Sequence, residues 1–259
     1  MCTHLNTRMN HTAVFISDIH LGSKKAKSKI LNTWLKTVNT ESLYLVGDIV
    51  DIWRFKQVFT MSHERQASHL EVVERILKTV RKGTRVHYLW GNHDEWMRTF
   101  AGHMLFGGIS LHERMVHTTR SGKRFLVLHG HQFDFLTKYP ATSWMYHAGD
   151  WCYEWLLVVN EWYNWCRRLL GMRYWSVSKY IKIKFKRAAQ FLESFETVIC
   201  RYARERGYDG VICGHLHDPK IKTIDGIVYA NCGCWTEREN CTYIYEDETG
   251  ELRLHKHEG

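Results

Sequence analysis

The amino-acid sequence predicts an α/β fold built around a parallel or mixed sheet. Its first 94 residues alternate short apolar runs with helical repeats in the order strand, helix, strand, helix, strand. Polar residues with useful chemistry follow directly after the apolar runs, where open α/β sheets place their functional sites. The length of 259 residues suits one large domain, or one domain that carries a sizeable insertion.

In the first half of the chain, short apolar runs that stop at turn residues predict three strands. We expect them at 13–17 (AVFIS), 42–46 (SLYLV) and 85–90 (RVHYLW). The apolar residues between these runs have helical spacing, which predicts helices over 24–38 and 62–82. Gly83 follows the second of these helices and is a typical end signal.

The second half of the chain predicts a different arrangement of short strands. Residues 110–118 and 123–128 flank Ser121-Gly122, which indicates a hairpin. Asp225-Gly226 marks another tight turn. The remaining strands are expected at 210–213, 219–224, 226–230 and 241–246.

Residues 138–206, between these halves, resemble an insertion and contain six of the 11 tryptophans. Two series of apolar residues step by three and four, which predicts two amphipathic helices separated by a loop near Gly171. The first series is Trp144, Ala148, Trp151, Trp155, Val158, Trp162 and Trp165. The second is Ile181, Phe185, Ala188, Leu192, Phe195, Ile199 and Tyr202. We expect a helical hairpin that acts as a lid.

Composition narrows the class of protein. The formal charge is +9, and no apolar stretch reaches the roughly 18–20 residues that a membrane-spanning helix needs. The N-terminal residues lack the apolar core of a signal peptide, so we expect a cytosolic protein with reduced thiols. Cys232-Gly-Cys234 is the one close cysteine pair, and it fits either metal binding or ordinary buried thiols.

The polar residues at the predicted strand ends share a chemistry. Carboxylate, imidazole and amide oxygen are ligands for divalent ions of intermediate hardness. The potential ligands are too many for one ion and enough for two, and a two-metal site needs one bridging carboxylate, for which Asp48 is the natural candidate. The residues in question are Asp18, His20, Asp48, Asn92, His93, Asp94, His129, His215 and His217.

The ordered motifs DIH, GDIVD, GNHD, HGH and GHLH resemble those of the calcineurin-like metallophosphoesterases. The resemblance implies a four-layer α/β/β/α sandwich with two divalent ions, commonly manganese, with iron or zinc also used. It implies one ion held by Asp18, His20, Asp48 and His217, and another by Asp48, Asn92, His129 and His215. His93 matches the catalytic histidine of the family, and Asp94 would orient its ring.

Within this family, the order YLVGDIVDIWR and the Trp-, Lys- and Arg-rich insertion are similar to the UDP-2,3-diacylglucosamine hydrolases of lipid A biosynthesis. These enzymes cleave a lipid-linked pyrophosphate to UMP and a diacylglucosamine 1-phosphate. They commonly carry Arg where this chain has His93. A phosphate leaving group needs little protonation, whereas an alkoxide benefits from an acid, so His93 keeps ordinary phosphoesters open as substrates.

The sequence is also compatible with two other functions. One is another phosphodiesterase or phosphomonoesterase, with a nucleotide or phospholipid substrate, on the same scaffold. The other is a metal-bearing scaffold without turnover, which the complete set of metal positions and His93 disfavours.

The insertion also predicts a surface partner. Residues 167–187 carry eight Lys or Arg and no Asp or Glu, beside the tryptophan-rich series. Such a segment suits an anionic membrane surface or a phosphate-bearing amphiphile, although an ordinary solvated basic face has the same composition. We therefore expect peripheral association with the inner face of the cytoplasmic membrane, and no nucleic-acid partner. The residues proposed for this contact are Arg167, Arg168, Lys182, Lys184, Lys186 and Arg187.

Overall fold

The computed structural model describes residues 10–105, 107–133, 195–237 and 241–257. The chain divides into a main unit, Met1–His131 with Ile199–Gly259, and a second unit, Gln132–Val198. The two apolar series and all six basic residues of the expected lid lie in the predicted insertion at 138–206, most of which is outside the described residues. Residues 199–206 of that prediction belong to the main unit.

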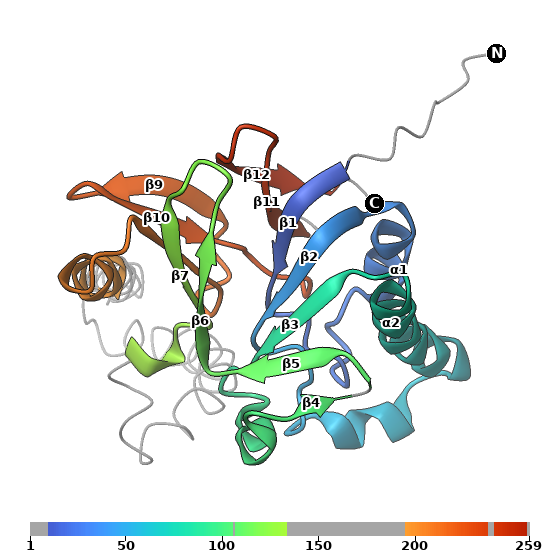
Figure 1. Cartoon of the computed structure of the whole chain (residues 1–259). Helices are drawn as coiled ribbons and strands as arrows, with labels where there is room; N and C mark the ends of the chain where they lie inside the picture. Colours follow the sequence, from blue (N-terminus) through green and yellow to red (C-terminus); the bar gives the residue numbers. More distant parts are fainter. Residues whose placement is uncertain (1–9, 106, 134–194, 238–240, 258–259) are drawn as a thin grey trace, which may run out of the picture. The chain divides into compact units, whose positions relative to one another are not determined.

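The main unit contains a seven-stranded mixed sheet in the order β12-β11-β1-β2-β3-β5-β4 (Figure 1). Its four central strands β1, β2, β3 and β5 are parallel, and β4, β11 and β12 run antiparallel to their neighbours. The strands are β1 Asn10–Ile16, β2 Asn39–Val46, β3 Arg85–Leu89, β4 Met104–Leu105, β5 Ile109–His112, β11 Thr242–Glu246 and β12 Leu252–Lys256.

A second sheet of five strands has the order β6-β7-β8-β10-β9. β7, β8 and β10 are parallel, while β6 and β9 form antiparallel edges, so the expected hairpins β6–β7 and β9–β10 are both confirmed. The strands are β6 Arg114–Thr118, β7 Arg124–Leu128, β8 Gly210–Cys213, β9 Lys220–Ile224 and β10 Ile227–Asn231.

The predicted strand at 110–118 is wrong as a single element. It divides at Glu113 into β5, which joins the larger sheet, and β6, which joins the smaller one. Continuous side-chain alternation cannot reveal a change of sheet, because the pattern is the same on both sides of the break. The sequence prediction also missed β4, β12 and the short 3-10 helices η1 Phe55–Thr60, η2 Glu95–Phe100 and η3 His131–Phe133.

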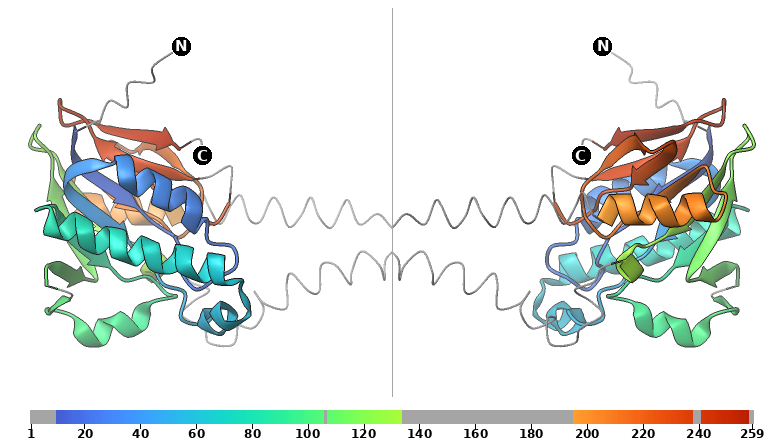
Figure 2. Two further views of the ribbon diagram at one scale, coloured as in Figure 1. Left: turned by 90° about the vertical axis from the view of Figure 1, so that its right-hand side faces the viewer. Right: turned by 90° about the vertical axis from the view of Figure 1, so that its left-hand side faces the viewer.

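Two helices pack on the outer face of the larger sheet, as the side views in Figure 2 show. They are α1 Ser28–Thr37 and α2 His63–Arg81. α2 begins where expected because Ser62 caps it, its hydroxyl accepting from the amide of Arg65 at 3.4 Å. α1 begins four residues later than the predicted helix at 24–38, and the turn before it is held by a bond from the Lys27 amide to the Trp235 carbonyl.

Alternating residues of β1 show how the layers are built. Val14 and Ile16 join the core beneath the helices with Trp34, whereas Phe15, between them, joins the core between the two sheets with Val127. The helical residues 199–205 lie against the outer face of the smaller sheet (Figure 2). The main unit therefore has the α/β/β/α layers that the resemblance implied. In the part of the chain that the structure describes, no helix has the length and apolar character to cross a membrane.

Candidate metal centre

The candidate ligands lie at the carboxyl ends of strands from both sheets. Asp18 and His20 follow β1, Asp48 follows β2, and Asn92 follows β3 in the larger sheet. From the smaller sheet come His129 after β7, then His215 and His217 after β8. The two sheets meet where the His215 amide, after β8, donates to Asp18 Oδ2, after β1, at 3.0 Å. Residues up to 199 positions apart in sequence are thereby brought together.

The backbone of these residues is unusual. Six non-glycine residues in the described part of the chain have positive φ. Five of them are candidate ligands, namely Asp18, His20, Asp48 and His217 at 53° and His215 at 69°, and the sixth is Asp225 in the β9–β10 turn. This left-handed conformation is unfavourable for residues with a Cβ and persists only where the surroundings enforce it. Its concentration here indicates that the fold is built to present these side chains.

The side chains converge on the carboxylates of Asp18 and Asp48. His217 Nε2 lies 3.0 Å from Asp18 Oδ1, and His129 Nε2 lies 3.4 Å from Asp48 Oδ2. His20 Nε2 lies between them, 3.8 Å from each of these two oxygens. The donor atoms form three overlapping groups in which all atoms lie within 4.8 Å of one another. These groups are Asp18–His20–His217, Asp18–Asp48–His129 and His20–Asp48–His93.

Several donor atoms of this cluster are buried without a hydrogen-bond partner, namely His20 Nε2, His129 Nε2 and Asn92 Oδ1. The Val46 carbonyl accepts a bond from His129 Nδ1 at 2.9 Å, so Nδ1 carries a proton and Nε2 is the ring nitrogen that faces Asp48. Buried polar atoms are rarely left unpaired, and this tautomer is typical of histidine metal ligands. The residues present therefore fit two divalent cations that share Asp48.

The charges of the cluster depend on one another. Burial opposes ionisation of Asp18 and Asp48, but the histidines around them lower both pKa values, that of Asp48 to about 2. Burial also opposes protonation of His129, and the two carboxylates overcome it and raise its pKa to about 9. In the absence of metal, the protein thus stabilises anionic carboxylates and positive imidazoles at neutral pH. Cations would replace the protons on those imidazoles.

Two glycines allow the clustered side chains to approach the backbone. A Cβ at Gly91 would collide with Asp48 Oδ1 and lie 2.7 Å from His129 Cδ2. A Cβ at Gly214 would collide with the side chains of Ser17 and Asp18. The glycines of the GNHD and GHLH motifs are therefore required by close packing against the ligands.

The structure corrects the expected partner of His93. Asp94 is buried beneath the site, where Oδ2 accepts from the Ile49 amide at 2.8 Å and from Tyr88 Oη at 2.6 Å. Its Oδ1 accepts from the Gly91 amide at 2.5 Å. Asp94 therefore braces the loops that carry Asp48 and Asn92, and the expectation that it orients the ring of His93 is wrong.

Asp51 takes the place expected for Asp94, and the sequence prediction missed it as a site residue. Its Oδ1 lies 3.2 Å from His93 Nδ1, and its Oδ2 lies 3.3 Å from His20 Nδ1. The signal was present, because Asp51 is the second acid of the GDIVD motif. Asp51 lies three residues after Asp48, and this spacing alone does not predict that both carboxylates face His93.

The remaining predicted residues lie at or beside the cluster. The ring of His215 is 5.2 Å from that of His129, and its amide donates to Asp18 Oδ2 at 3.0 Å. The backbone amide of His93 donates to Asp48 Oδ1 at 2.8 Å. Cys232 and Cys234 are both fully buried. The six basic residues of the insertion lie outside the described residues.

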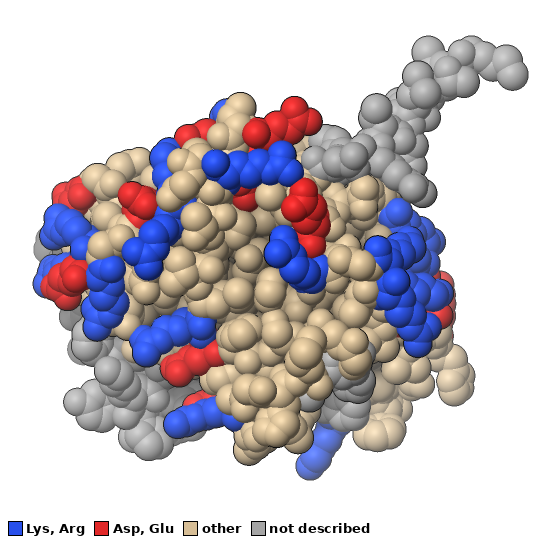
Figure 3. Space-filling model, viewed as in Figure 1, with Lys and Arg blue, Asp and Glu red and all other residues tan. Residues whose placement is uncertain are grey.

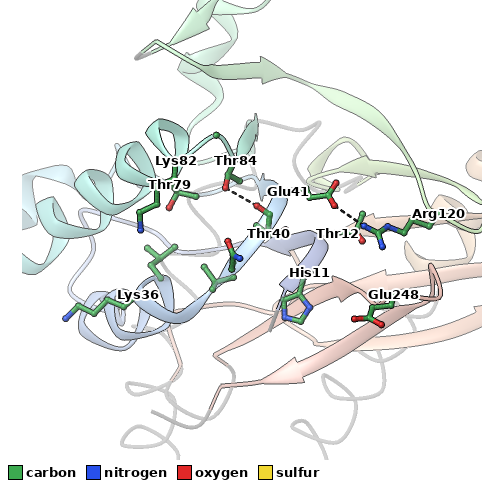
Figure 4. Close-up of a pocket in the computed structure, with 14 residues that line it drawn as sticks. His11, Thr12, Lys36, Thr40, Glu41, Thr79, Lys82, Thr84, Arg120 and Glu248 are labelled. Atoms are coloured by element: carbon green, nitrogen blue, oxygen red, sulfur yellow. Dashed lines mark hydrogen bonds and ion pairs between the residues drawn. The ribbon is translucent and has the colours of Figure 1, made fainter. Parts of the chain in front are cut away.

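A separate hollow of about 800 Å³ lies at the opposite end of the larger sheet. The starts of β1 and β2 and the ends of α1 and α2 line it, and two pairs of its polar residues bond to each other (Figure 4). Arg120 bonds Glu41 at 2.9 Å, and Thr84 donates to the Thr40 carbonyl at the same distance. Lys and Arg gather over α1 and α2 on this side (Figure 3). None of the candidate ligands lines this hollow.

Comparisons with known proteins agree with the motifs. The family model described as Calcineurin-like phosphoesterase matches residues 11–219. A UDP-2,3-diacylglucosamine hydrolase of Porphyromonas gingivalis is 26% identical over 129 residues, 47% of each chain. One from Hahella chejuensis is 32% identical over 84 residues, 31% of this chain and 32% of that protein. This chain thus spans about half the length, or less, of the curated relatives it matches.

Among solved structures, an archaeal phosphodiesterase aligns with 93% of this chain and 97% of its own, at 15% identity and a TM-score of 0.43. The family model covers most of the chain, including every candidate metal ligand from Asp18 to His217. The chain belongs to the calcineurin-like phosphoesterase family.

Proposed function

We propose that this protein is a two-metal phosphohydrolase that cleaves the pyrophosphate of UDP-2,3-diacylglucosamine to UMP and 2,3-diacylglucosamine 1-phosphate. The observation that carries the hydrolase assignment is the convergence of His20, His129 and His217 on two buried carboxylates. Asp18, His20, Asp48 and His217 would hold one ion, and Asp48, Asn92, His129 and His215 the other. We propose manganese as the metal.

Two ions bound here would acidify a water molecule and neutralise the phosphoryl oxygens. The protein residues supply the fixed geometry for this chemistry. Asp94 braces the backbone directly after Asp48 and the backbone directly before Asn92, and the amide of His93 holds Asp48 Oδ1 in place. The site therefore needs little rearrangement to receive a phosphoryl group, which is the condition for effective electrostatic stabilisation.

His93 is the proposed catalytic residue. Its Nδ1 lies 3.2 Å from Asp51 Oδ1, and its Nε2 lies 3.9 Å from Asp48 Oδ2, at the edge of the cluster. In the protonated ring, Nε2–H donates to a phosphoryl oxygen or to the leaving oxygen. Trp53 packs on the imidazole with ring centroids 4.6 Å apart, which limits its rotation.

The surroundings of His93 support an amphiphilic substrate. A cavity of about 580 Å³ opens beside Asn92 and His93, with Ile52, Trp53 and Trp96 among its walls. These three apolar side chains are 41%, 59% and 43% exposed, although large apolar residues are usually buried. An apolar wall next to a phosphate-binding centre suits a molecule with acyl chains and a pyrophosphate. The names of the two relatives support the same substrate class.

The test is product analysis with manganese-loaded protein. We expect UMP and diacylglucosamine 1-phosphate from UDP-2,3-diacylglucosamine, and faster turnover of this substrate than of UDP-N-acetylglucosamine, which lacks the acyl chains. Trp53→Ala should raise KM for the lipid substrate and leave KM for a small aryl phosphodiester unchanged. If no UMP forms while aryl phosphodiesters are still cleaved, the substrate assignment is wrong and the assignment as a phosphohydrolase stands.

A second candidate function follows from His93. An acid positioned beside the metal centre assists an alkoxide leaving group more than a phosphate leaving group. We therefore keep a phosphodiesterase or phosphomonoesterase of nucleotides or phospholipids as the alternative. Faster turnover of such esters than of the UDP-sugar lipid would favour it.

A further inference from the structure

The hydroxyl of Ser17, the residue directly after β1, is buried beneath the candidate metal centre. Ser17 and its neighbour Asp18 are both fully buried. Ser17 Oγ donates to Asp18 Oδ2 and lies 2.7 Å from the Val46 carbonyl, at the end of β2. A Cβ at Gly214 would collide with the same hydroxyl, so this glycine encloses it from the smaller sheet. One hydroxyl therefore connects a proposed metal ligand with the end of the neighbouring strand.

The Ser17 hydroxyl has one proton and two acceptors within reach. The Val46 carbonyl has another donor, His129 Nδ1, at 2.9 Å, so this carbonyl stays paired when the hydroxyl donates elsewhere. A hydrogen bond to an ionised carboxylate is also stronger than a bond to a neutral carbonyl. The proton of Ser17 Oγ is therefore donated to Asp18 Oδ2.

The two oxygens of Asp18 consequently have different partners. Oδ2 accepts from Ser17 Oγ and from the His215 amide, the latter at 3.0 Å. Oδ1 faces two imidazoles, with His217 Nε2 at 3.0 Å and His20 Nε2 at 3.8 Å. The protein's own donors thus occupy one oxygen, and the other oxygen faces the nitrogens that would share an ion with it.

We propose that Ser17 is a positioning residue of the metal centre, whose hydroxyl holds Asp18 Oδ2 so that Oδ1 is the oxygen that binds the cation. Carboxylate ligands are generally held by hydrogen bonds from neighbouring groups, and the loss of such a partner weakens metal binding. Among the described residues, the side-chain hydrogen bonds of Ser17 are made to Asp18 and Val46. The effect should therefore be confined to the ion held by Asp18 and His217. The inference rests on the proposed metal centre and is independent of the substrate.

The test is titration of the metal-free full-length protein with Mn²⁺, in which the electron paramagnetic resonance signal reports the free ion. We expect the wild type to bind two ions, and Ser17→Ala to bind one of them about 10- to 100-fold more weakly. Ser28→Ala is the matched control, because Ser28 is also buried and its hydroxyl lies 2.6 Å from Ser68 Oγ. This control should bind both ions as the wild type does.

Two ligand variants identify the ion that is affected. In His129→Ala the tighter remaining ion is the one held by Asp18, and the added Ser17→Ala change should weaken it about 10- to 100-fold. In His217→Ala the tighter remaining ion is the other one, and the added change should leave its affinity unaltered. A loss of packing alone would weaken both ions alike.

Two results would overturn the proposal, namely wild-type affinity in Ser17→Ala and equal weakening of both ions. If circular dichroism shows that Ser17→Ala does not fold, Ser17→Cys replaces it, because a thiol is a weaker donor of similar shape. Its loss should be smaller and at the same ion, and unchanged affinity would again overturn the proposal. Fewer than two ions in the wild type would contradict the proposed metal centre, and this inference with it. Substrate is absent throughout, so failure of the lipid assignment would leave these results unaffected.

Discussion

His93 Nδ1 lies 3.2 Å from Asp51 Oδ1, and the other oxygen of the same carboxylate accepts from His20 Nδ1 at 3.3 Å. One buried side chain therefore orients both the proposed catalytic histidine and a proposed metal ligand. Arg54 completes the arrangement, with its backbone amide donating to Asp51 Oδ1 at 3.0 Å. Burial opposes ionisation of Asp51, but the two histidines hold its pKa well below the ordinary value.

Replacing Asp51 should separate orientation from metal binding. We expect Asp51→Asn to lower kcat by about 10²- to 10⁴-fold, because the imidazole of His93 loses its anionic partner. At saturating Mn²⁺ the metal content should stay near that of the wild type, since all seven ligand side chains remain, while the loss of the partner of His20 weakens the affinity about 10- to 100-fold. Elemental analysis and steady-state kinetics on the same preparation check this. Unchanged kcat would remove the orienting role.

Removal of His93 tests the leaving-group assignment. If the ring protonates the leaving oxygen, His93→Ala should slow cleavage of alkyl or aryl phosphoesters by about 10²- to 10⁴-fold and affect pyrophosphate cleavage less. The comparison is kcat for the two substrate types with the same variant. Equal losses would leave only stabilisation of the phosphoryl charge.

Asp48 is the proposed shared ligand of both ions. Asp48→Ala should therefore remove both metals and reduce turnover to near background. Elemental analysis gives the number of ions for each chain, with Glu64→Ala, an exposed surface carboxylate, as the control. Wild-type turnover in Asp48→Ala would exclude the two-metal mechanism.

The basic segment of the predicted lid is tested by charge removal. We expect simultaneous replacement of Lys182, Lys184, Lys186 and Arg187 by Gln to release the protein from anionic vesicles, because each cation contributes about 1 kcal/mol at such a surface. KM for a lipid substrate should rise, while that for a soluble phosphodiester is unchanged. Added salt should reproduce the release from vesicles in the wild type. Circular dichroism controls for folding, and retained vesicle binding would contradict the membrane partner.

Acid should destabilise the fold through His87. Burial, together with the charges of His112 and Arg85, lowers its pKa from 6.5 to about 4, and the ring bonds Ser110 Oγ at 2.8 Å. Between pH 6.5 and 4 the unfolded chain binds this proton more strongly than the folded protein, so stability falls as pH falls. The loss is less than about 1.4 kcal/mol per pH unit, because the ring is partly exposed.

His87→Gln should therefore reduce the difference in unfolding free energy between about pH 7 and pH 5. Urea denaturation of the metal-free proteins measures it, because metal release then makes no contribution. Identical pH dependence in both proteins would show that His87 is not involved.

The sequence by itself determined the strands of the larger sheet that carry ligands, the long helix α2 and the identity of the candidate ligands. These features are local, since an apolar run, its turn and the polar residue that follows it are contiguous in the chain. Because the carboxyl ends of parallel strands meet at one edge of a sheet, the order of these runs also places Asp18, Asp48 and Asn92 together.

Only the tertiary structure decided how the two sheets meet and which carboxylate serves which histidine. The division of 110–118 between the two sheets depends on packing between segments distant in sequence. Packing between distant segments also decided that Asp51, and not Asp94, faces His93. Asp94 adjoins His93 in the chain, but its oxygens are directed to the Ile49 and Gly91 amides, because buried backbone groups must be paired. Asp51, 42 positions before His93 in the sequence, faces the imidazole instead.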